Sequence, residues 1–453
     1  MPKKLAVFCD GTWNDLRTSD LTNVARLAKC VAPVDPATDM RQIVYYDEGV
    51  GVSSNISKTT DHLVHLAGGA FGRGLDRKIE AAYRFLVLNF EPQDEIFIFG
   101  FSRGAYTARS LCGLIRKCGI VRRDCFDRVP EAMALYRDRD LKPKDAEVSS
   151  FRENYSNKCS AGAEDTDWVK ARLGDKQPEE FKRVEHNGRA WLSQHRPSYA
   201  YRIMYLGVWD TVGSLGVPKS IWILQSFNKK YRFHDTELSS LLASVRHAVA
   251  IEEDRRVFDV TRMDNIAELN GEWAVANAKR EERWDVVRSD APNYVPYNHR
   301  PYQQVWFPGG HGAVGGGNPE PGLYNATLLW IAEGACWAGL AFDQDPRIVL
   351  QTAAGRVNPL ANWRVDKRGK PQSKRAFDLL ALIGGRLKRK GPPTSEEIGV
   401  TAKLRWRANE KWRPRTAEAL RVVNPPVQPP PSAPPGFPAP PPGCPAVPLS
   451  YPQ

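Results

Sequence analysis

Cysteine is scarce in this sequence, and its cysteines do not form close pairs. The 453 residues include 8 cysteines, at positions 9, 30, 112, 118, 125, 159, 336 and 444. No two of them have the two-residue separation on which zinc ribbons and thioredoxin-type redox sites are built, so neither class of site is favoured. Several lie within apolar runs, which predicts that they are small core side chains. We expect a reducing compartment for such a chain.

Long apolar runs are also lacking. No stretch approaches the roughly 20 apolar residues that a transmembrane helix needs. Residues 1–10 enter a strand pattern at once, with no signal peptide ahead of it. We therefore expect the protein to be cytoplasmic as synthesised, and any export to use a route without a cleaved signal peptide. No internal repeat is present, and no pattern of side chains indicates a metal or a cofactor.

Positive charge is in excess, with a formal net charge of +12 and a pI of about 9.3. Such an excess favours an acidic partner, either nucleic acid or an anionic membrane surface. Much of it lies in a basic segment, residues 361–420, which also contains Trp363, Trp406 and Trp412. Because tryptophan favours membrane interfaces and basic residues attract anionic head groups, we expect an anionic membrane partner and no nucleic acid. The alternative, tryptophans packed on the core beneath a solvated charged surface, fits equally well.

Short apolar runs and helix-like segments alternate along the first 340 residues. Strand composition is found in residues 5–9, 42–46, 96–99, 202–209 and 304–307, and helical spacing in residues 75–89 and 324–340. The apolar run 241–251 is also predicted to be a buried helix. This alternation predicts an α/β fold, a mostly parallel sheet with helices on both faces.

The domain organisation follows from changes in amino-acid composition along the chain. Residues 121–200 are densely charged with short apolar runs, which predicts a helical insertion where folds of this kind carry a cap. We assign residues 1–360 to a catalytic domain, 361–420 to the basic segment and 421–453 to a proline-rich, disordered tail. If the basic segment binds membranes, a chain ending near Asn358 is expected to keep activity on a soluble short-chain ester and to lose it on anionic vesicles.

The strongest chemical signal is Gly100-Phe101-Ser102-Arg103-Gly104. It follows an aromatic and β-branched run and precedes a helix-like segment. A Gly-x-Ser-x-Gly turn between strand and helix lifts a serine hydroxyl clear of the sheet. Glycines are needed there because the turn crowds its neighbours. Ser102 is therefore the predicted nucleophile, and an ordinary tight turn is the alternative.

A serine nucleophile needs a histidine base, and His311 is the candidate among 8 histidines. In such folds the chain order is serine, acid, histidine. His311 follows a predicted strand and lies in a glycine-rich loop, although such a loop can also be a simple turn. His247 lies in an apolar run and is predicted to be a core residue. The others precede the serine or lie in the insertion or in polar loops: His62, His65, His186, His195, His234 and His299.

Asp210 is the predicted acid because it ends a strand and lies between serine and histidine in the chain. Asp254 and Glu252 are the runners-up. An oxyanion hole needs two backbone N–H donors. Arg103, the residue after the nucleophile, supplies one of them, and the turn at Gly11 and Thr12 is the candidate for the other.

Four ordered motifs resemble one family. They are Phe8-Cys9-Asp10-Gly11-Thr12-Trp13-Asn14, the elbow just described, Gly207-Val208-Trp209-Asp210-Thr211-Val212-Gly213 and Trp306-Phe307-Pro308-Gly309-Gly310-His311. The chain is similar to the uncharacterised α/β-hydrolase domain family that includes the type VI secretion phospholipase effectors. The resemblance implies an α/β-hydrolase fold, the triad Ser102, Asp210 and His311, ester hydrolysis of a lipid, and a secretion-system partner. Family members usually carry an aspartate where this chain has Ala313.

Three other functions are weighed against a lipase or phospholipase. A cytoplasmic esterase acting on small soluble esters would use the same triad. A haloacid-dehalogenase-type phosphatase would use Asp10, but it needs a second aspartate at the position of Thr12. A catalytically weak protein that binds anionic surfaces would use only the basic segment, which leaves the serine, aspartate and histidine unexplained.

Overall fold

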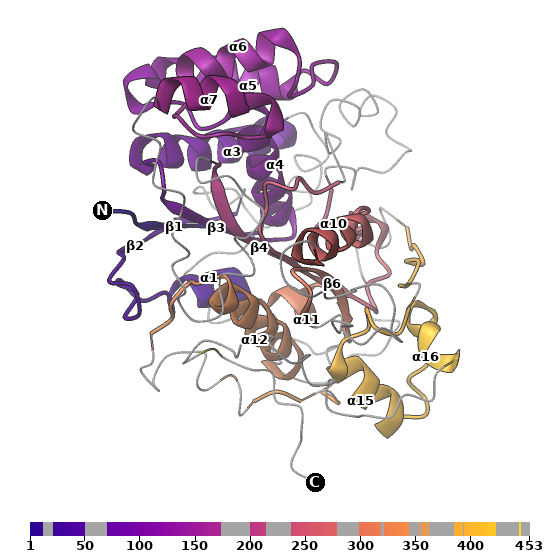
Figure 1. Ribbon diagram of the computed structural model, residues 1–453. Helices are drawn as coiled ribbons and strands as arrows, with labels where there is room; N and C mark the ends of the chain where they lie inside the picture. The colour runs from indigo at the N-terminus through magenta and orange to yellow at the C-terminus, as the bar shows by residue number, and fades with distance from the viewer. Residues whose placement is uncertain are drawn as a thin grey trace.

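The computed structural model describes residues 1–11, 21–49, 70–173, 200–213, 237–278, 299–318, 321–343, 353, 356–358, 360–361, 385–392, 394–422 and 444. These residues build an α/β unit in which helices pack around one sheet (Figure 1). Within this part of the chain, no helix is long and apolar enough to cross a membrane.

The sheet has six strands in the order β2-β1-β3-β4-β5-β6, and every neighbouring pair is parallel. This confirms the predicted α/β class with a mostly parallel sheet. Parallel strands place their carboxyl ends at one edge, where folds of this class bind ligands. The strands are β1 (Lys4–Cys9), β2 (Gln42–Asp47), β3 (Glu95–Phe101), β4 (Arg202–Trp209), β5 (Val245–Ala250) and β6 (Tyr302–Phe307).

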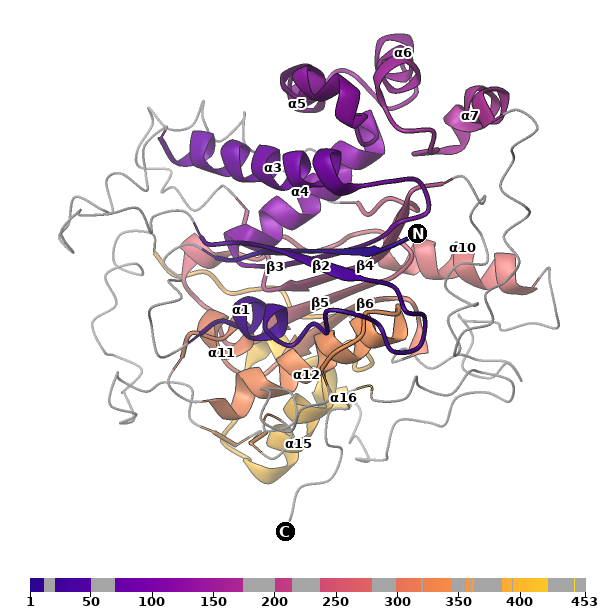
Figure 2. The same ribbon diagram turned by 90° about the vertical axis from the view of Figure 1, so that its left-hand side faces the viewer.

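Helices cover both faces of the sheet, as Figure 2 shows. On one face lie α3 (Ala70–Asn89) and α4 (Arg103–Cys118), and on the other α1 (Asn23–Ala28), α11 (His311–Gly315) and α12 (Pro321–Trp337). The strands read as continuous apolar runs because both of their faces are buried. In β3 every residue is buried, and Phe99 stacks on Phe8 with ring centroids 4.5 Å apart.

The predicted helical insertion is helical where it is described, and its described helices pack on α3 and α4. It contains η1 (Arg123–Arg128), α5 (Val129–Arg137), α6 (Ala146–Tyr155), η2 (Ala163–Asp165) and α7 (Thr166–Leu173). These helices form an outer layer on α3 and α4 (Figure 2). The reason is that α4 runs for 16 residues, about 24 Å, away from the elbow before the insertion begins. Residues 174–199 lie outside the described part.

One predicted helix is a strand. Residues 241–251 include β5, whose six residues are all buried. A short apolar run fits a buried helix and a buried strand equally well by its periodicity. The β-branched Val245 and Val249 favour the strand, and the pairing of β5 with both β4 and β6 makes it an interior strand.

The basic segment packs on the sheet where it is described. Its residues 397–399 run beside β6, because Trp306 N–H donates to Glu397 O at 2.8 Å and Gly399 N–H donates to Trp306 O at 2.9 Å. The helices α15 (Val400–Ala408) and α16 (Ala419–Val422) and the turn η7 (Arg415–Ala417) follow.

The tryptophans of this segment pack on the core. Trp406 and Trp412 are buried in one apolar cluster with Trp306, Val249 and Ile251. A membrane-facing role is therefore wrong for Trp406 and Trp412, and the alternative of tryptophans packed on the core holds for both. Trp363 lies outside the described residues.

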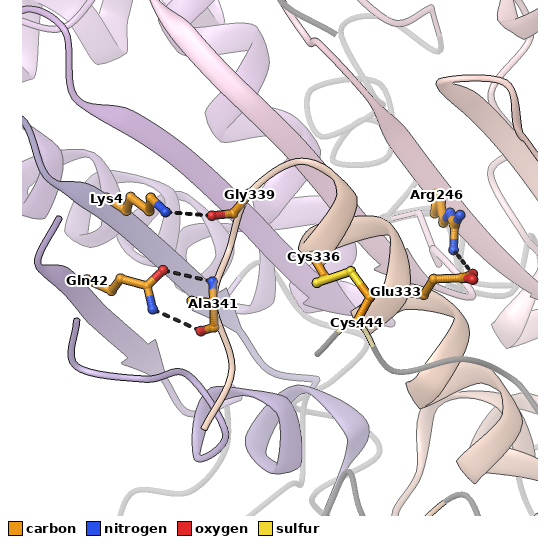
Figure 3. Close-up of a disulfide and its surroundings, with 8 residues drawn as sticks. All are labelled: Lys4, Gln42, Arg246, Glu333, Cys336, Gly339, Ala341 and Cys444. Atoms are coloured by element: carbon orange, nitrogen blue, oxygen red, sulfur yellow. Dashed lines mark hydrogen bonds and ion pairs between the residues drawn. A yellow bond between two sulfur atoms is a disulfide. The ribbon is translucent and has the colours of Figure 1, made fainter. Parts of the chain in front are cut away.

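A disulfide joins Cys336 of α12 to Cys444 (Figure 3). The expectation of reduced core cysteines is wrong for this pair, although the other six cysteines are free and five of them are buried. In the same region, Gln42 exchanges two hydrogen bonds with the backbone of Ala341 at 2.8 and 2.9 Å. The predicted disorder of residues 421–453 falls outside the described part, apart from residues 421–422 and Cys444.

Candidate active site

Ser102 lies on a strained turn at the end of β3. Its backbone has φ 58° and ψ −119°, a region that non-glycine residues rarely adopt. The strain is held by the neighbours: Ser102 N–H donates to Trp209 O at 3.0 Å. A Cβ at Gly104 would lie 2.0 Å from Cys9 O, and one at Gly100 would lie 2.4 Å from Gly104 O. Both positions therefore require glycine, as the sequence pattern predicts.

His311 connects Ser102 to Asp210. Its Nε2 lies 2.8 Å from Ser102 Oγ, and its Nδ1 lies 2.7 Å from Asp210 Oδ2. Since an ionised carboxylate can only accept, Nδ1–H donates and Nε2 is left to accept the serine proton. The imidazole packs against the rings of Phe101 and Phe258, each 4.6 Å away between centroids. All three polar side chains are buried.

The backbone of His311 is fixed as well. The histidine is the first residue of α11, directly after β6 and the turn at Gly309, where φ is +101°. Its N–H donates to Glu253 Oε2 at 3.0 Å, and Glu253 forms an ion pair with Arg255 at 2.7 Å. Burial raises the pKa of Glu253, but its bonds to Arg255 and the charge of Arg255 lower it overall. Glu253 is thus an ionised anchor for the loop that carries the histidine.

Asp210 is fully buried and receives donors from several elements. Oδ1 accepts from Ala250 N–H at 2.9 Å and from Arg389 Nη1 at 2.7 Å, and Oδ2 accepts from Arg389 Nη2 at 2.9 Å. Burial by itself would raise the pKa of Asp210. The Arg389 charge and the bonds from His311 and Arg389 outweigh it and hold the pKa well below its usual range. The carboxylate therefore stays ionised.

The runner-up acids bind elsewhere. Asp254 is paired with Arg386 near the surface, and Glu252 accepts from Gly309 N–H at 2.8 Å. Of the three acids considered, only Asp210 contacts the imidazole ring.

His247 is a core histidine, as the sequence suggests. Its Nε2 accepts from Thr211 N–H at 3.2 Å, and its Nδ1 contacts Gln304 Oε1 at 3.0 Å. Burial, assisted by the nearby Arg109 charge, lowers the pKa of His247 to about 3. It is therefore neutral and supports the strand ends beside Asp210. Five other histidines lie outside the described residues: His62, His65, His186, His195 and His234.

Of the residues predicted to form an oxyanion hole, the structure describes Arg103 and Gly11. Arg103 is the first residue of α4, so its N–H belongs to the helix N-terminus, where no intrahelical acceptor is available. Gly11 N–H donates to Asp10 Oδ1 at 2.6 Å, and Asp10 also accepts from Tyr46 OH at 2.8 Å. Thr12 lies outside the described residues. The roles of Arg103, Gly11 and Thr12 remain predictions.

No cluster of three or more metal-binding side chains occurs within the described part of the chain. At the position of the family aspartate, Ala313 is buried in a small apolar cluster with Leu323 and Ala361. Its side chain packs and offers no acid to the site.

A family model decides the classification. The model of the type VI secretion phospholipase effector Tle1-like catalytic domain matches residues 3–334, well over half of the chain. The chain belongs to this family. The four sequence motifs that indicated the family all lie within the matched residues.

Other comparisons place this Tle1-like chain among longer proteins. An uncharacterized protein of Saccharomyces cerevisiae, YEL023C, is 27% identical over 265 residues, which are 56% of this chain and 32% of the yeast protein. The structure of the Tle1 effector bound to the VgrG spike has 16% identity and a TM-score of 0.30, covering 70% of this chain and 52% of that one. An uncharacterized Pseudomonas aeruginosa structure has 16% identity and a TM-score of 0.38, covering 94% and 56%. The chain thus spans between about a third and just over half of the length of these proteins.

Sequence reasoning missed Arg389 and Glu253. Glu253 lies in the sequence between Glu252 and Asp254, the two alternative acids. This acidic run was the only signal in the sequence that could have pointed to it. Arg389 lies in the run Arg386-Leu387-Lys388-Arg389-Lys390, where nothing distinguishes one basic residue from the next. It also lies beyond the residues that the Tle1-like family model matches.

Proposed function

We propose that this chain is a serine ester hydrolase of the lipase or phospholipase kind, acting through Ser102, His311 and Asp210. Membership of a phospholipase effector family implies hydrolase activity. The observation that carries the finer proposal is the continuous chain of contacts from Ser102 Oγ through His311 to Asp210, at 2.8 and 2.7 Å. Reach and orientation of this kind are the geometric requirement for an activated serine.

The mechanism follows from these contacts. His311 Nε2 takes the proton from Ser102 Oγ as the oxygen attacks the ester carbonyl. The tetrahedral oxyanion is stabilised by the Arg103 N–H at the start of α4, together with a second donor from the turn at Gly11 and Thr12. The Gly11 N–H could serve only after leaving Asp10 Oδ1, to which it donates here. His311 then returns the proton to the departing alcohol, which leaves an acyl-enzyme on Ser102. Water, deprotonated by the same imidazole, releases the acid. Asp210 stabilises the imidazolium in both steps.

The substrate class and the partner are proposed from the family to which the chain belongs. A phospholipid or another lipid ester is the expected substrate, and a type VI secretion component is the expected partner. Delivery would then use that machinery without a cleaved signal peptide. A small soluble ester is the alternative substrate, and both candidates are distinguished by comparing hydrolysis of phospholipid vesicles with that of a short-chain p-nitrophenyl ester.

A fluorophosphonate probe tests the nucleophile directly, because it phosphonylates only an activated serine. We expect labelling of the wild-type protein and none of Ser102→Ala. Ser110→Ala, which changes a buried serine two turns along α4, is the matched control and should be labelled normally. Equal labelling of Ser102→Ala and the wild type would overturn the assignment. His311→Ala should be nearly as inactive as Ser102→Ala, and the double variant should lose little more, since the two act as a unit.

A further inference from the structure

Arg389 comes from the C-terminal part of the chain and reaches the acid of the proposed triad. Its two terminal nitrogens donate to the two oxygens of Asp210, at 2.7 and 2.9 Å. Its side chain is 2% exposed and that of Asp210 is 0% exposed. A planar guanidinium that meets a carboxylate with two parallel bonds fixes the plane of the carboxylate as well as its position.

The arginine is itself held by the site. Nη1 also donates to Ala250 O at 2.8 Å, and Nη2 donates to Phe258 O. Ala250 ends β5 and also donates its N–H to Asp210 Oδ1, while the ring of Phe258 stacks on His311. Arg389 therefore connects three groups around the imidazole.

We propose that Arg389 is a positioning residue of the active site: its fork holds Asp210 with Oδ2 toward His311 Nδ1 and makes the C-terminal segment a part of the catalytic unit. This inference rests on the proposed function. The carboxylate has two oxygens and could otherwise rotate. With Oδ1 bound by Ala250 N–H and Arg389, Oδ2 is the oxygen that faces the imidazole. The segment is then required for activity on every ester, which replaces the expectation that a chain ending near Asn358 stays active.

The charge of Arg389 also acts on the imidazole. His311 faces the carboxylates of Asp210 and Glu253, and these two are paired with Arg389 and Arg255 respectively. Asp259 lies near enough to Arg389 for the two charges to interact, and burial raises the pKa of Asp259. His247, which lies near enough to Asp210 for the two to interact, is neutral because its pKa is about 3. Arg389 is thus the cation that offsets Asp210.

A neighbouring cation opposes protonation of the imidazole, so removing it has a predictable sign. His311 works as a base only when it is neutral, so protonation of its imidazole abolishes activity. In Arg389→Gln the imidazolium faces Asp210 without the competing cation and is stabilised. The acidic limb of the pH profile should therefore move to higher pH, by on the order of one unit. Loss of the fork should also lower the maximal rate.

The experiment measures the rate of fluorophosphonate labelling of Ser102 against pH in the full-length protein. The matched control is Arg405→Gln, which changes another buried arginine of the same segment, one that donates to Ala361 O. We expect the acidic limb to move in Arg389→Gln and to stay at the wild-type pH in Arg405→Gln. If Arg389 only stabilised the fold, Arg389→Gln would lower the melting temperature, as Arg405→Gln would. The acidic limb of the pH profile would then stay at the wild-type pH in both variants. An unshifted limb in Arg389→Gln therefore overturns the proposal.

Arg389→Lys keeps the test decisive where Arg389→Gln does not fold. A lysine keeps the charge but has no planar fork. The acidic limb should then stay at the wild-type pH while the maximal labelling rate falls by at least tenfold, and a wild-type rate would overturn the positioning role. The two proposals fail separately. If the wild type is not labelled at Ser102, the proposed function fails, whereas normal labelling with unchanged Arg389 variants sinks only the present inference.

Discussion

Asp210 has two partners of different kinds, and this determines how its variants should behave. It accepts a hydrogen bond from His311 Nδ1 and forms an ion pair with the buried Arg389. Its backbone φ is +37°, a conformation that asparagine also tolerates. Asp210→Asn therefore changes the charge with little change in shape, and its effects on rate and on stability have separate causes.

We expect Asp210→Asn to lower turnover by about 10⁴-fold, because the amide no longer selects the tautomer of His311 that can accept the serine proton. It should also lower stability by roughly 3–5 kcal/mol, because a buried arginine loses its counter-charge. Ester hydrolysis and chemical denaturation measure the two effects.

The double variant Asp210→Asn with Arg389→Gln is the control for this prediction. It removes both charges, so it should recover part of the stability and none of the turnover. Near-normal turnover in Asp210→Asn would show that another group is the acid. Unchanged stability would show that the pair with Arg389 does not form in solution.

At the scale of the elements, the turn between β3 and α4 is the one that most clearly requires a particular residue. A Cβ at Gly104 would meet the backbone of β1, 2.0 Å from Cys9 O. Backbone cannot move aside as the end of a flexible side chain can. Position 104 therefore requires glycine because α4 approaches β1 so closely.

Gly104→Ala should destabilise the protein by about 3 kcal/mol or more, at the upper end of what overpacking costs. Gly271→Ala is the matched control, since Gly271 lies within α10 (Ile266–Ala278) and a Cβ there would meet nothing within 4 Å. It should stabilise the protein by about 0.5–1 kcal/mol, because alanine favours a helix interior. Thermal unfolding of both variants shows whether Gly104→Ala is less stable and Gly271→Ala more stable than the wild type. A Gly104→Ala variant as stable as the wild type would contradict the close packing.

The elements also show what could be predicted from the sequence. The apolar runs at β1, β3 and β6 identified buried strands. The loops that follow β3, β4 and β6 contain Ser102, Asp210 and His311, which could be expected to lie close together because parallel strands end at one edge. Local signals were insufficient elsewhere. The run at β5 fits helix and strand alike, and the position of the insertion depends on the direction in which α4 leads the chain.

The contact of Arg389 with Asp210 is a different case, because it joins positions 179 residues apart. No local pattern selects one arginine of a basic run for such a contact. The same holds for Trp406 and Trp412, whose composition fitted a membrane interface and a packed core equally well. Only the packing of the segment beside β6 shows that these tryptophans belong to the core.

At the scale of the whole molecule, the Cys336–Cys444 disulfide joins α12 to the C-terminal region over 108 residues of sequence. Cross-linking so long a stretch restricts the unfolded chain and typically stabilises a protein by about 2–5 kcal/mol. The described residues 385–392 and 394–422 lie between these two cysteines in the sequence.

Cys444→Ser should therefore lower the melting temperature, and a reducing agent should lower that of the wild type to a similar value without affecting the variant. Cys125→Ser is the control, since Cys125 is free and only half-buried, and it should still respond to reductant as the wild type does. Thermal unfolding with and without dithiothreitol makes the comparison. A wild-type melting temperature that does not respond to reductant would rule out this stabilisation.

The disulfide also makes residues 336–444 a closed covalent ring, and Arg389 belongs to it. A single nick by a protease anywhere between the two cysteines opens the ring but leaves both pieces tethered. The piece carrying Arg389 then stays at a high effective concentration beside Asp210 and can rebind without diffusing away. In an oxidising, protease-rich environment, the molecule would keep its active site after a cut that would otherwise release the arginine.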